Sequence, residues 1–149
     1  MRKMRIYFDN CCFNRPYDDQ SYEIIRLETE AKLYIQDKIR NNKIELIWSF
    51  ILDYENSENP YEDQKDAIYA WKKKSVFYLG PSESVREKAK ELIKNIHTKP
   101  KDTLHLACAI EANCDYLLTT DKYMIKKTAT LSEIKVVNPL DFLLLEEGK

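Results

Sequence analysis

Short apolar segments alternate along this chain with longer segments in which apolar residues recur every three or four positions. The short segments are rich in β-branched and aromatic residues and are bounded by polar or turn-forming residues, which is the pattern of β-strands. Five strands are therefore predicted, at Arg5–Phe8, Ile44–Trp48, Ser75–Leu79, Tyr116–Thr120 and Ile134–Val137.

The longer segments predict amphipathic helices. Between Tyr22 and Arg40, for example, Leu27, Ala31 and Ile35 lie on one helical face, with charged residues between them. Further helices are predicted at Ser49–Glu58, Gln64–Lys74 and Asp102–Asn113, and others that begin at Ser84 and at Pro139. Because strands alternate with helices throughout, we expect one domain, residues 1–149, built as a three-layer α/β/α sandwich around a mainly parallel sheet.

Composition places the chain among globular proteins, with 44% hydrophobic and 33% charged residues. No apolar run approaches the roughly 20 residues that span a bilayer, and Asp9 interrupts the N-terminal apolar run too soon for a signal peptide. We therefore expect a cytoplasmic protein that does not associate with membranes. The net charge of −1 counts mildly against nucleic-acid binding, although basic residues can still gather on one face.

The 4 cysteines have two interpretations. Without a secretory context, reduced thiols are expected rather than disulfides, and we interpret them as small buried hydrophobic residues. A zinc site from Cys11, Cys12, His105 and Cys108 is the alternative, since His105 and Cys108 lie one helical turn apart. The set lacks a paired C-x-x-C spacing, so we favour the first interpretation.

Acidic residues follow two of the predicted strands. Asp9 comes directly after the first strand and Asp121 directly after the fourth, where α/β proteins place their sites. Asp102 opens a predicted helix, and Glu55 lies within another, where Asp53 is a rival for the same role. Each acid alone is explained by a turn, a helix cap or a solvated helix face. Together they predict a site for a hard divalent cation, because such ions prefer oxygen ligands and relieve the repulsion between clustered carboxylates.

Four segments, in order along nearly the whole chain, together resemble a PIN domain. They are Tyr7–Pro16, Lys101–Ala109, Cys114–Asp121 and Val137–Phe142, and Lys101–Asp121 is the most specific stretch. The resemblance implies a sheet ordered 3-2-1-4-5, with Asp9, Glu55, Asp102 and Asp121 as catalytic, metal-binding acids and the Thr119 hydroxyl in support. Many such proteins are VapC-like toxins, ribonucleases that a small antitoxin silences, and the family habit is to form homodimers.

The resulting hypothesis is an endoribonuclease that uses Mg²⁺ or Mn²⁺ to activate the water that attacks an RNA phosphodiester. The candidate substrate-binding residues are Asn10, Arg15, Thr119 and Lys122. Basic residues near the acids in sequence are further candidates for phosphate contacts: Lys99, Lys101, Lys126 and Lys127. A solvated charged rim is an equally good interpretation of these residues. His105 lies one helical turn from Asp102, and we expect it to be structural or to support the site rather than to act catalytically.

Two other functions are weighed against this one. The first is a PIN-like interaction module with weak or no catalysis, which the presence of all four acids disfavours. The second is a phosphotransfer enzyme with Asp9 as nucleophile, which ranks lower because no second acid lies two residues on and no P-loop is present. Apolar stripes on the early helices suit either the core or a groove for a second copy or an antitoxin.

Overall fold

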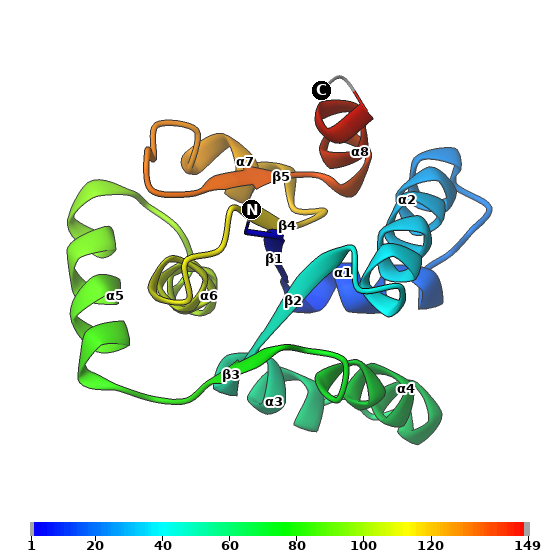
Figure 1. The fold of residues 1–149 in the computed structure, drawn as a ribbon, viewed down its shortest axis with the longest axis horizontal. Helices are drawn as coiled ribbons and strands as arrows, with labels where there is room; N and C mark the ends of the chain where they lie inside the picture. Colours follow the sequence, from blue (N-terminus) through cyan, green and yellow to red (C-terminus); the bar gives the residue numbers. More distant parts are fainter. Residues whose placement is uncertain (1, 148–149) are drawn as a thin grey trace.

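Five parallel strands form one sheet in the order β3-β2-β1-β4-β5 (Figure 1). The computed structural model describes residues 2–147. The strands are β1 (Met4–Phe8), β2 (Ile44–Ser49), β3 (Phe77–Leu79), β4 (Tyr116–Leu118) and β5 (Lys135–Val137). Both the α/β class and the strand order expected from the sequence are confirmed.

The central strand, β1, is buried on both faces. Ile6, Tyr7 and Phe8 have no exposed surface, as expected for a parallel strand covered by helices on each side. Ile6 is paired with Leu46 of β2 and with Tyr116 of β4. The strand order reverses between β1 and β4, so these neighbouring strands end beside each other at the carboxyl edge of the sheet.

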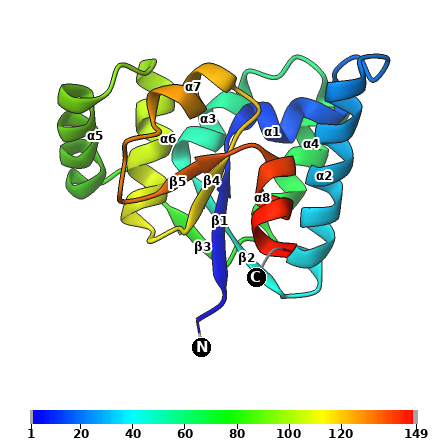
Figure 2. The ribbon, with the colours of Figure 1, turned by 90° about the horizontal axis from the view of Figure 1, so that it is seen from above.

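Helices cover both faces of the sheet, which gives the three layers seen in Figures 1 and 2. One face carries α2 (Glu23–Arg40), α4 (Glu62–Lys72) and α8 (Pro139–Glu147), and the other carries α5 (Glu83–Asn95) and α6 (Pro100–Glu111). Three shorter helices follow strands directly: α1 (Asn10–Asn14), α3 (Phe50–Ser57) and α7 (Lys122–Lys127). Figure 2 shows these three at the carboxyl edge of the sheet, opposite the N-terminus.

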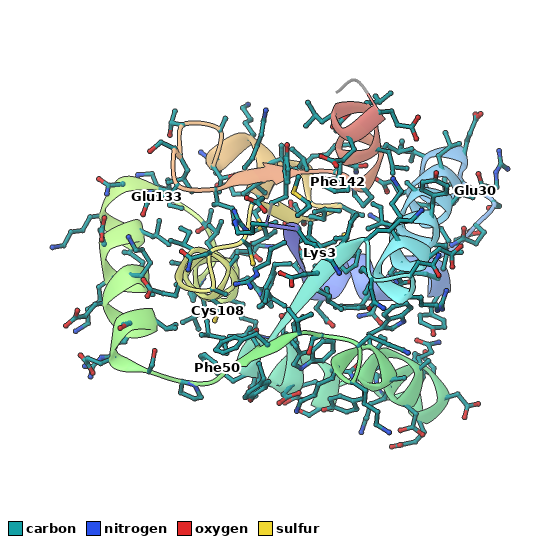
Figure 3. The ribbon with its side chains drawn as sticks, viewed as in Figure 1. Lys3, Glu30, Phe50, Cys108, Glu133 and Phe142 are labelled. Carbon is teal, nitrogen blue, oxygen red and sulfur yellow. The ribbon has the colours of Figure 1, made fainter. Side chains whose placement is uncertain are left out.

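Aromatic side chains link the sheet to the helices on one face. The rings of Phe8 and Phe13 lie 5.3 Å apart between centroids, and Phe13 lies 5.3 Å from Trp48. Phe142 on α8 is fully buried, whereas Glu30 and Glu133 lie at the periphery of the molecule (Figure 3). This packing anchors the beginning of α1, and with it the segment that carries Asp9.

Most predicted elements are confirmed within a few residues, and the differences have local causes. The helix expected to begin at Ser84 is capped by Ser82, whose hydroxyl accepts the Val85 N–H at 3.2 Å. The helix expected from Asp102 begins at Pro100, a residue suited to a first helical position because it has no N–H to satisfy. A short 3₁₀ helix, Arg15–Tyr17, follows α1. Within residues 2–147, no helix combines the length and the apolar character needed to cross a membrane.

Candidate functional site

A cavity of about 370 Å³ lies at the carboxyl edge of the sheet, and all four predicted acids line it. Asp9 comes from the end of β1, Glu55 from α3, Asp102 from α6 and Asp121 from the start of α7. The remaining lining residues are Asn10, Cys11, Arg15, His105 and Thr120. Residues up to 112 positions apart thus reach one cavity through the parallel topology.

Two of the acids also cap helices. The Asp9 N–H donates to the Leu118 carbonyl oxygen at 3.2 Å, and its side-chain Oδ1 accepts the Cys12 N–H at 3.1 Å. Asp121 Oδ1 accepts the N–H groups of Tyr123 at 2.9 Å and Met124 at 3.2 Å. The capping role weighed for these residues is therefore real, and the same bonds hold both carboxylates at the cavity.

Asp102, by contrast, is not a cap, because Lys99 occupies that position and Asp102 lies in the first turn of α6. Burial raises its pKa, and repulsion from Asp121 acts in the same direction, while His105 opposes the rise. Burial also raises the pKa of Asp9 well above its ordinary value, and the charge on Cys11 adds to the effect. A divalent cation in the cavity would counter both effects by favouring the charged carboxylates.

The structure separates Glu55 from its rival on the same helix. The Asp53 carboxylate accepts hydrogen bonds from Trp48 Nε1 at 2.8 Å and Tyr78 OH at 3.1 Å, and pairs with Lys72 Nζ at 2.9 Å. These partners engage Asp53 in packing between α3, α4 and the sheet. Glu55 instead lines the cavity and accepts a hydrogen bond from His105 Nε2.

The candidate substrate-binding residues occupy different places. Asn10 and Arg15 line the cavity with the acids, and Arg15 also forms ion pairs with Asp18 at 2.9 Å and Glu28 at 3.2 Å. Thr119 is buried outside the cavity lining, and its hydroxyl accepts the Asp121 N–H at 3.1 Å.

Two of the lysines near the acids line a cavity, and the other three belong to α7. Lys122 is the first residue of α7 and is not among the lining residues. Lys99 and Lys101 line an adjoining cavity of about 510 Å³ together with Glu55, Asp102 and Asp121. Lys126 and Lys127 lie in the last turn of α7.

The donors around the cavity suit a hydrated hard cation. In the described part of the chain, no three His, Cys, Asp or Glu side chains lie close enough together to coordinate one ion directly. Mg²⁺, however, retains several waters and binds through only one or two carboxylates in many proteins. Asn10 Oδ1 is buried without a hydrogen-bond partner in the same cavity. An unpaired amide oxygen on a residue that lines the cavity with four acids fits a cation that carries its own water.

The cysteines do not form the alternative zinc set. All four are free thiols, and Cys12, Cys108 and Cys114 are buried. Cys12 Sγ donates to the Leu118 carbonyl at 3.3 Å, and burial raises the pKa of Cys108 to about 12. The nitrogen atoms of His105 face Tyr7 and Glu55. The interpretation as small buried residues is confirmed for these three thiols and is wrong for Cys11, which is only partly buried and lines the cavity.

Cys11 and Thr120 line the cavity, although the sequence did not predict either as part of the acidic site. Cys11 Sγ lies 2.9 Å from Asp9 Oδ1, 3.3 Å from Thr119 Oγ1 and 3.2 Å from Thr120 Oγ1. This Sγ donates to Asp9 Oδ1, and hydrogen bonding with Cys12, above all, and with Asp9, Thr119 and Thr120 lowers the pKa of Cys11 to about 5. The available signal was that Cys11 lies two residues after Asp9, the acid that follows the first predicted strand.

Comparison with known proteins identifies the fold. No family model matches the chain, and neither does any curated protein. Among solved structures, VapBC2 from Rickettsia felis, bound to a DNA fragment from its promoter, matches with a TM-score of 0.56 at 15% identity, over 91% of this chain and 98% of that one. A toxin–antitoxin complex from Klebsiella pneumoniae matches at 0.56 and 20% identity, over 90% and 97% of the two chains.

A third structure, VapBC-1 from nontypeable Haemophilus influenzae, matches with a TM-score of 0.57 at 14% identity, over 92% of this chain and 99% of that one. The matches span nearly the full length of both chains, so they concern the whole sheet and its helices rather than a fragment. At these identities the likeness is one of fold, and the chain accordingly has the PIN-like fold, shared with chains of VapBC complexes, that its sequence motifs predict.

Proposed function

We propose that this protein is a metal-dependent endoribonuclease that hydrolyses phosphodiester bonds in RNA. The observation that carries the proposal is that Asp9, Glu55, Asp102 and Asp121, from four separate elements, line one cavity at the strand-order reversal. Two of these carboxylates have pKa values raised in the metal-free protein, so the site favours a cation. Mg²⁺ or Mn²⁺ is the ion whose ligand preference fits an all-oxygen set.

The residues of the chain have distinct tasks in this proposal. Asp9 and Asp121 are held in place by the helix N–H groups that they cap, so their orientation is set before substrate arrives. Lys99 and Lys101 border the acids on one side and are placed to contact phosphates. A divalent ion bound among the acids would supply Lewis-acid stabilisation of the phosphate and a water of lowered pKa.

We further propose that the ribonuclease is the toxin of a toxin–antitoxin pair and acts in the cytoplasm. The similar folds belong to VapBC and toxin–antitoxin complexes, which supports a small antitoxin as partner. Exposed apolar side chains on or beside α2, namely Tyr22, Ile24, Leu27 and Tyr34, are suited to a partner helix or a second copy in a homodimer.

The decisive variant for the activity is Asp9→Asn. Asparagine retains the side-chain oxygen that caps α1 but removes the charge. With labelled single-stranded RNA and Mg²⁺ or Mn²⁺, we expect the wild type to cleave, EDTA to stop cleavage, and Asp9→Asn to lose activity by roughly 100-fold or more. Full activity of Asp9→Asn with an unchanged circular dichroism spectrum would remove Asp9 from the mechanism.

A non-catalytic interaction module is the second candidate function. One observation favours it: within residues 2–147, no three His, Cys, Asp or Glu side chains lie close enough together to coordinate one ion directly. The two functions differ in metal binding, because an interaction module has no need of an ion. Titration with Mn²⁺ by calorimetry therefore separates them: binding supports the nuclease, and its absence at millimolar Mn²⁺ supports the module.

A further inference from the structure

A chain of buried hydrogen bonds crosses the sheet and ends at Glu55. The Ser49 hydroxyl of β2 lies 2.6 Å from the Tyr7 hydroxyl of β1, which lies 2.5 Å from Nδ1 of His105 on α6. The opposite ring nitrogen, Nε2, bonds Glu55 Oε1 on α3. Ser49 and Tyr7 have no exposed surface, and His105 is 1% exposed. The four elements β1, β2, α3 and α6 thus contribute one side chain each to one hydrogen-bonded network.

Which group donates in each of these hydrogen bonds follows from the hydrogens that each side chain carries. A carboxylate only accepts, so Nε2 of His105 carries the hydrogen that Glu55 receives. With a neutral imidazole, Nδ1 accepts from the Tyr7 hydroxyl, and the Tyr7 oxygen accepts from Ser49. Ser49 Oγ in turn accepts the Leu52 N–H at 3.4 Å as the cap of α3. Burial raises the pKa of Tyr7 well above its ordinary value, so its hydroxyl keeps its hydrogen.

The orientation of the His105 ring is defined from two sides. Its Nδ1 is bonded to Tyr7, and the two rings meet edge to face with centroids 5.4 Å apart. Because the ring is buried and bonded through Nδ1, its Nε2 is held toward Glu55 at the edge of the cavity. A histidine present only for packing could satisfy its nitrogen atoms with backbone groups, whereas His105 bonds an acid that lines the cavity.

We propose that His105, oriented by Tyr7, is a positioning residue that holds Glu55 at the metal site. The inference rests on the proposed function and adds a role that the acids alone do not reveal. A glutamate on a short helix has several rotamers and loses their freedom when it is ordered. The hydrogen bond from His105 engages Glu55 Oε1. The second carboxylate oxygen, Oε2, takes no part in that bond and is the oxygen proposed to face the metal. Groups that hydrogen-bond a ligating side chain in this manner commonly change metal affinity by 10–100-fold when removed.

Two variants of similar size separate positioning from packing. The side-chain amide of His105→Gln reaches the place of Nε2 and can donate to Glu55, whereas that of His105→Asn reaches only the place of Nδ1, beside Tyr7. Both keep a polar group in the buried site, so a role in packing alone predicts similar effects for the two. A role in positioning predicts that only His105→Asn behaves like Glu55→Gln.

The experiment is calorimetric titration of the full chain with Mn²⁺. We expect Glu55→Gln and His105→Asn each to weaken Mn²⁺ binding by about tenfold, the double variant to weaken it no further, and His105→Gln to stay close to the wild type. If His105→Asn does not fold, Tyr7→Phe replaces it, because loss of the hydroxyl frees the ring and should weaken Mn²⁺ binding in the same direction.

Three outcomes overturn the role of His105 alone: unchanged Mn²⁺ affinity in the folded His105→Asn or Tyr7→Phe variant, equal losses in the Gln and Asn variants, or losses that add in the double variant. A wild type that binds no Mn²⁺ overturns the proposed function, and the positioning role with it.

Discussion

Asp53 and Glu55 lie two residues apart on α3, yet their carboxylates face different environments. Asp53 is engaged by Trp48, Lys72 and Tyr78, whereas Glu55 lines the cavity with the other three acids. On a helix, residues two apart point in different directions. The helical geometry therefore assigns one acid to packing and the other to the site.

This separation predicts opposite effects for two similar substitutions. Asp53→Asn should lower the free energy of unfolding by about 1–2 kcal/mol, because it weakens charge-assisted hydrogen bonds to Lys72 and its neighbours. It should leave Mn²⁺ affinity unchanged. Glu55→Gln should change stability little and weaken Mn²⁺ binding. Urea unfolding and Mn²⁺ titration of both variants check the assignment, which fails if Asp53→Asn is the one that impairs metal binding.

The pH dependence of stability should report the crowded carboxylates. The pKa of Asp9 and that of Asp102 are raised in the folded chain. The folded state then holds protons that the unfolded state releases, so this stability is complete below the unfolded carboxyl pKa near 4 and is lost as pH rises through the raised folded values.

Asp9→Asn removes one of these charges while keeping the cap of α1. In EDTA at pH 7 we expect it to increase the free energy of unfolding and to flatten the fall in stability as pH rises above the unfolded carboxyl pKa. Urea unfolding at several pH values measures both effects. A metal-free Asp9→Asn variant less stable than the wild type at pH 7 would contradict the raised pKa.

Adding the metal should offset the loss of stability that the buried, ionised carboxylates cause in the metal-free protein. A ligand present at 100 times its Kd stabilises the folded state by about 2.7 kcal/mol, which corresponds to several degrees in Tm for a chain of 149 residues. We expect Mg²⁺ or Mn²⁺ to raise the Tm of the wild type and to have little effect on Asp9→Asn or Asp102→Asn. Thermal unfolding followed by circular dichroism tests this, and equal shifts in all three proteins would place the ion elsewhere.

Lys101 offers a test of RNA contact that does not depend on cleavage. Its Nζ lies 5.4 Å from the Tyr54 ring centroid, beside the cavity shared by Glu55 and Asp102. In the Asp9→Asn background, Lys101→Ala should weaken single-stranded RNA binding and reduce the slope of log K against log salt by about 0.7.

The matched control is Lys38→Ala. Lys38 also lies over a tyrosine, 5.2 Å from the Tyr34 ring centroid, but it belongs to α2 and lines neither cavity. Fluorescence anisotropy at several salt concentrations gives the slopes. If binding does not depend on salt, or if both substitutions act alike, the phosphate contact assigned to Lys101 is wrong.

The sequence predicted the sheet well because its strands are short apolar runs with clear boundaries. Asp9 and Asp121 were identifiable as candidates for the same reason, since each directly follows such a run. The short helices α1 and α7 were missed because 5 and 6 residues are too few for a helical period to appear. Because α1 and α7 begin directly after Asp9 and Asp121, the same two carboxylates cap a helix and line the cavity.

What the sequence could not reveal depends on contacts between distant residues. The helical pattern does not distinguish Glu55 from Asp53, and only the family resemblance favoured Glu55. The physical difference is visible once His105 is seen beside Glu55 and Lys72 beside Asp53. Tyr7 reads as an ordinary strand residue, although its hydroxyl links Ser49 to His105. Such bonds span 42 to 98 positions and leave no periodic signal in the chain.

A crystal grown with Mn²⁺ shows whether a hydrated divalent ion binds in the cavity that the four carboxylates line. We expect an anomalous scattering peak in the cavity lined by Asp9, Glu55, Asp102 and Asp121, and its loss in crystals of the Asp9→Asn variant. A cavity without such a peak at saturating Mn²⁺, or an ion bound only elsewhere on the molecule, would contradict the proposed metal site.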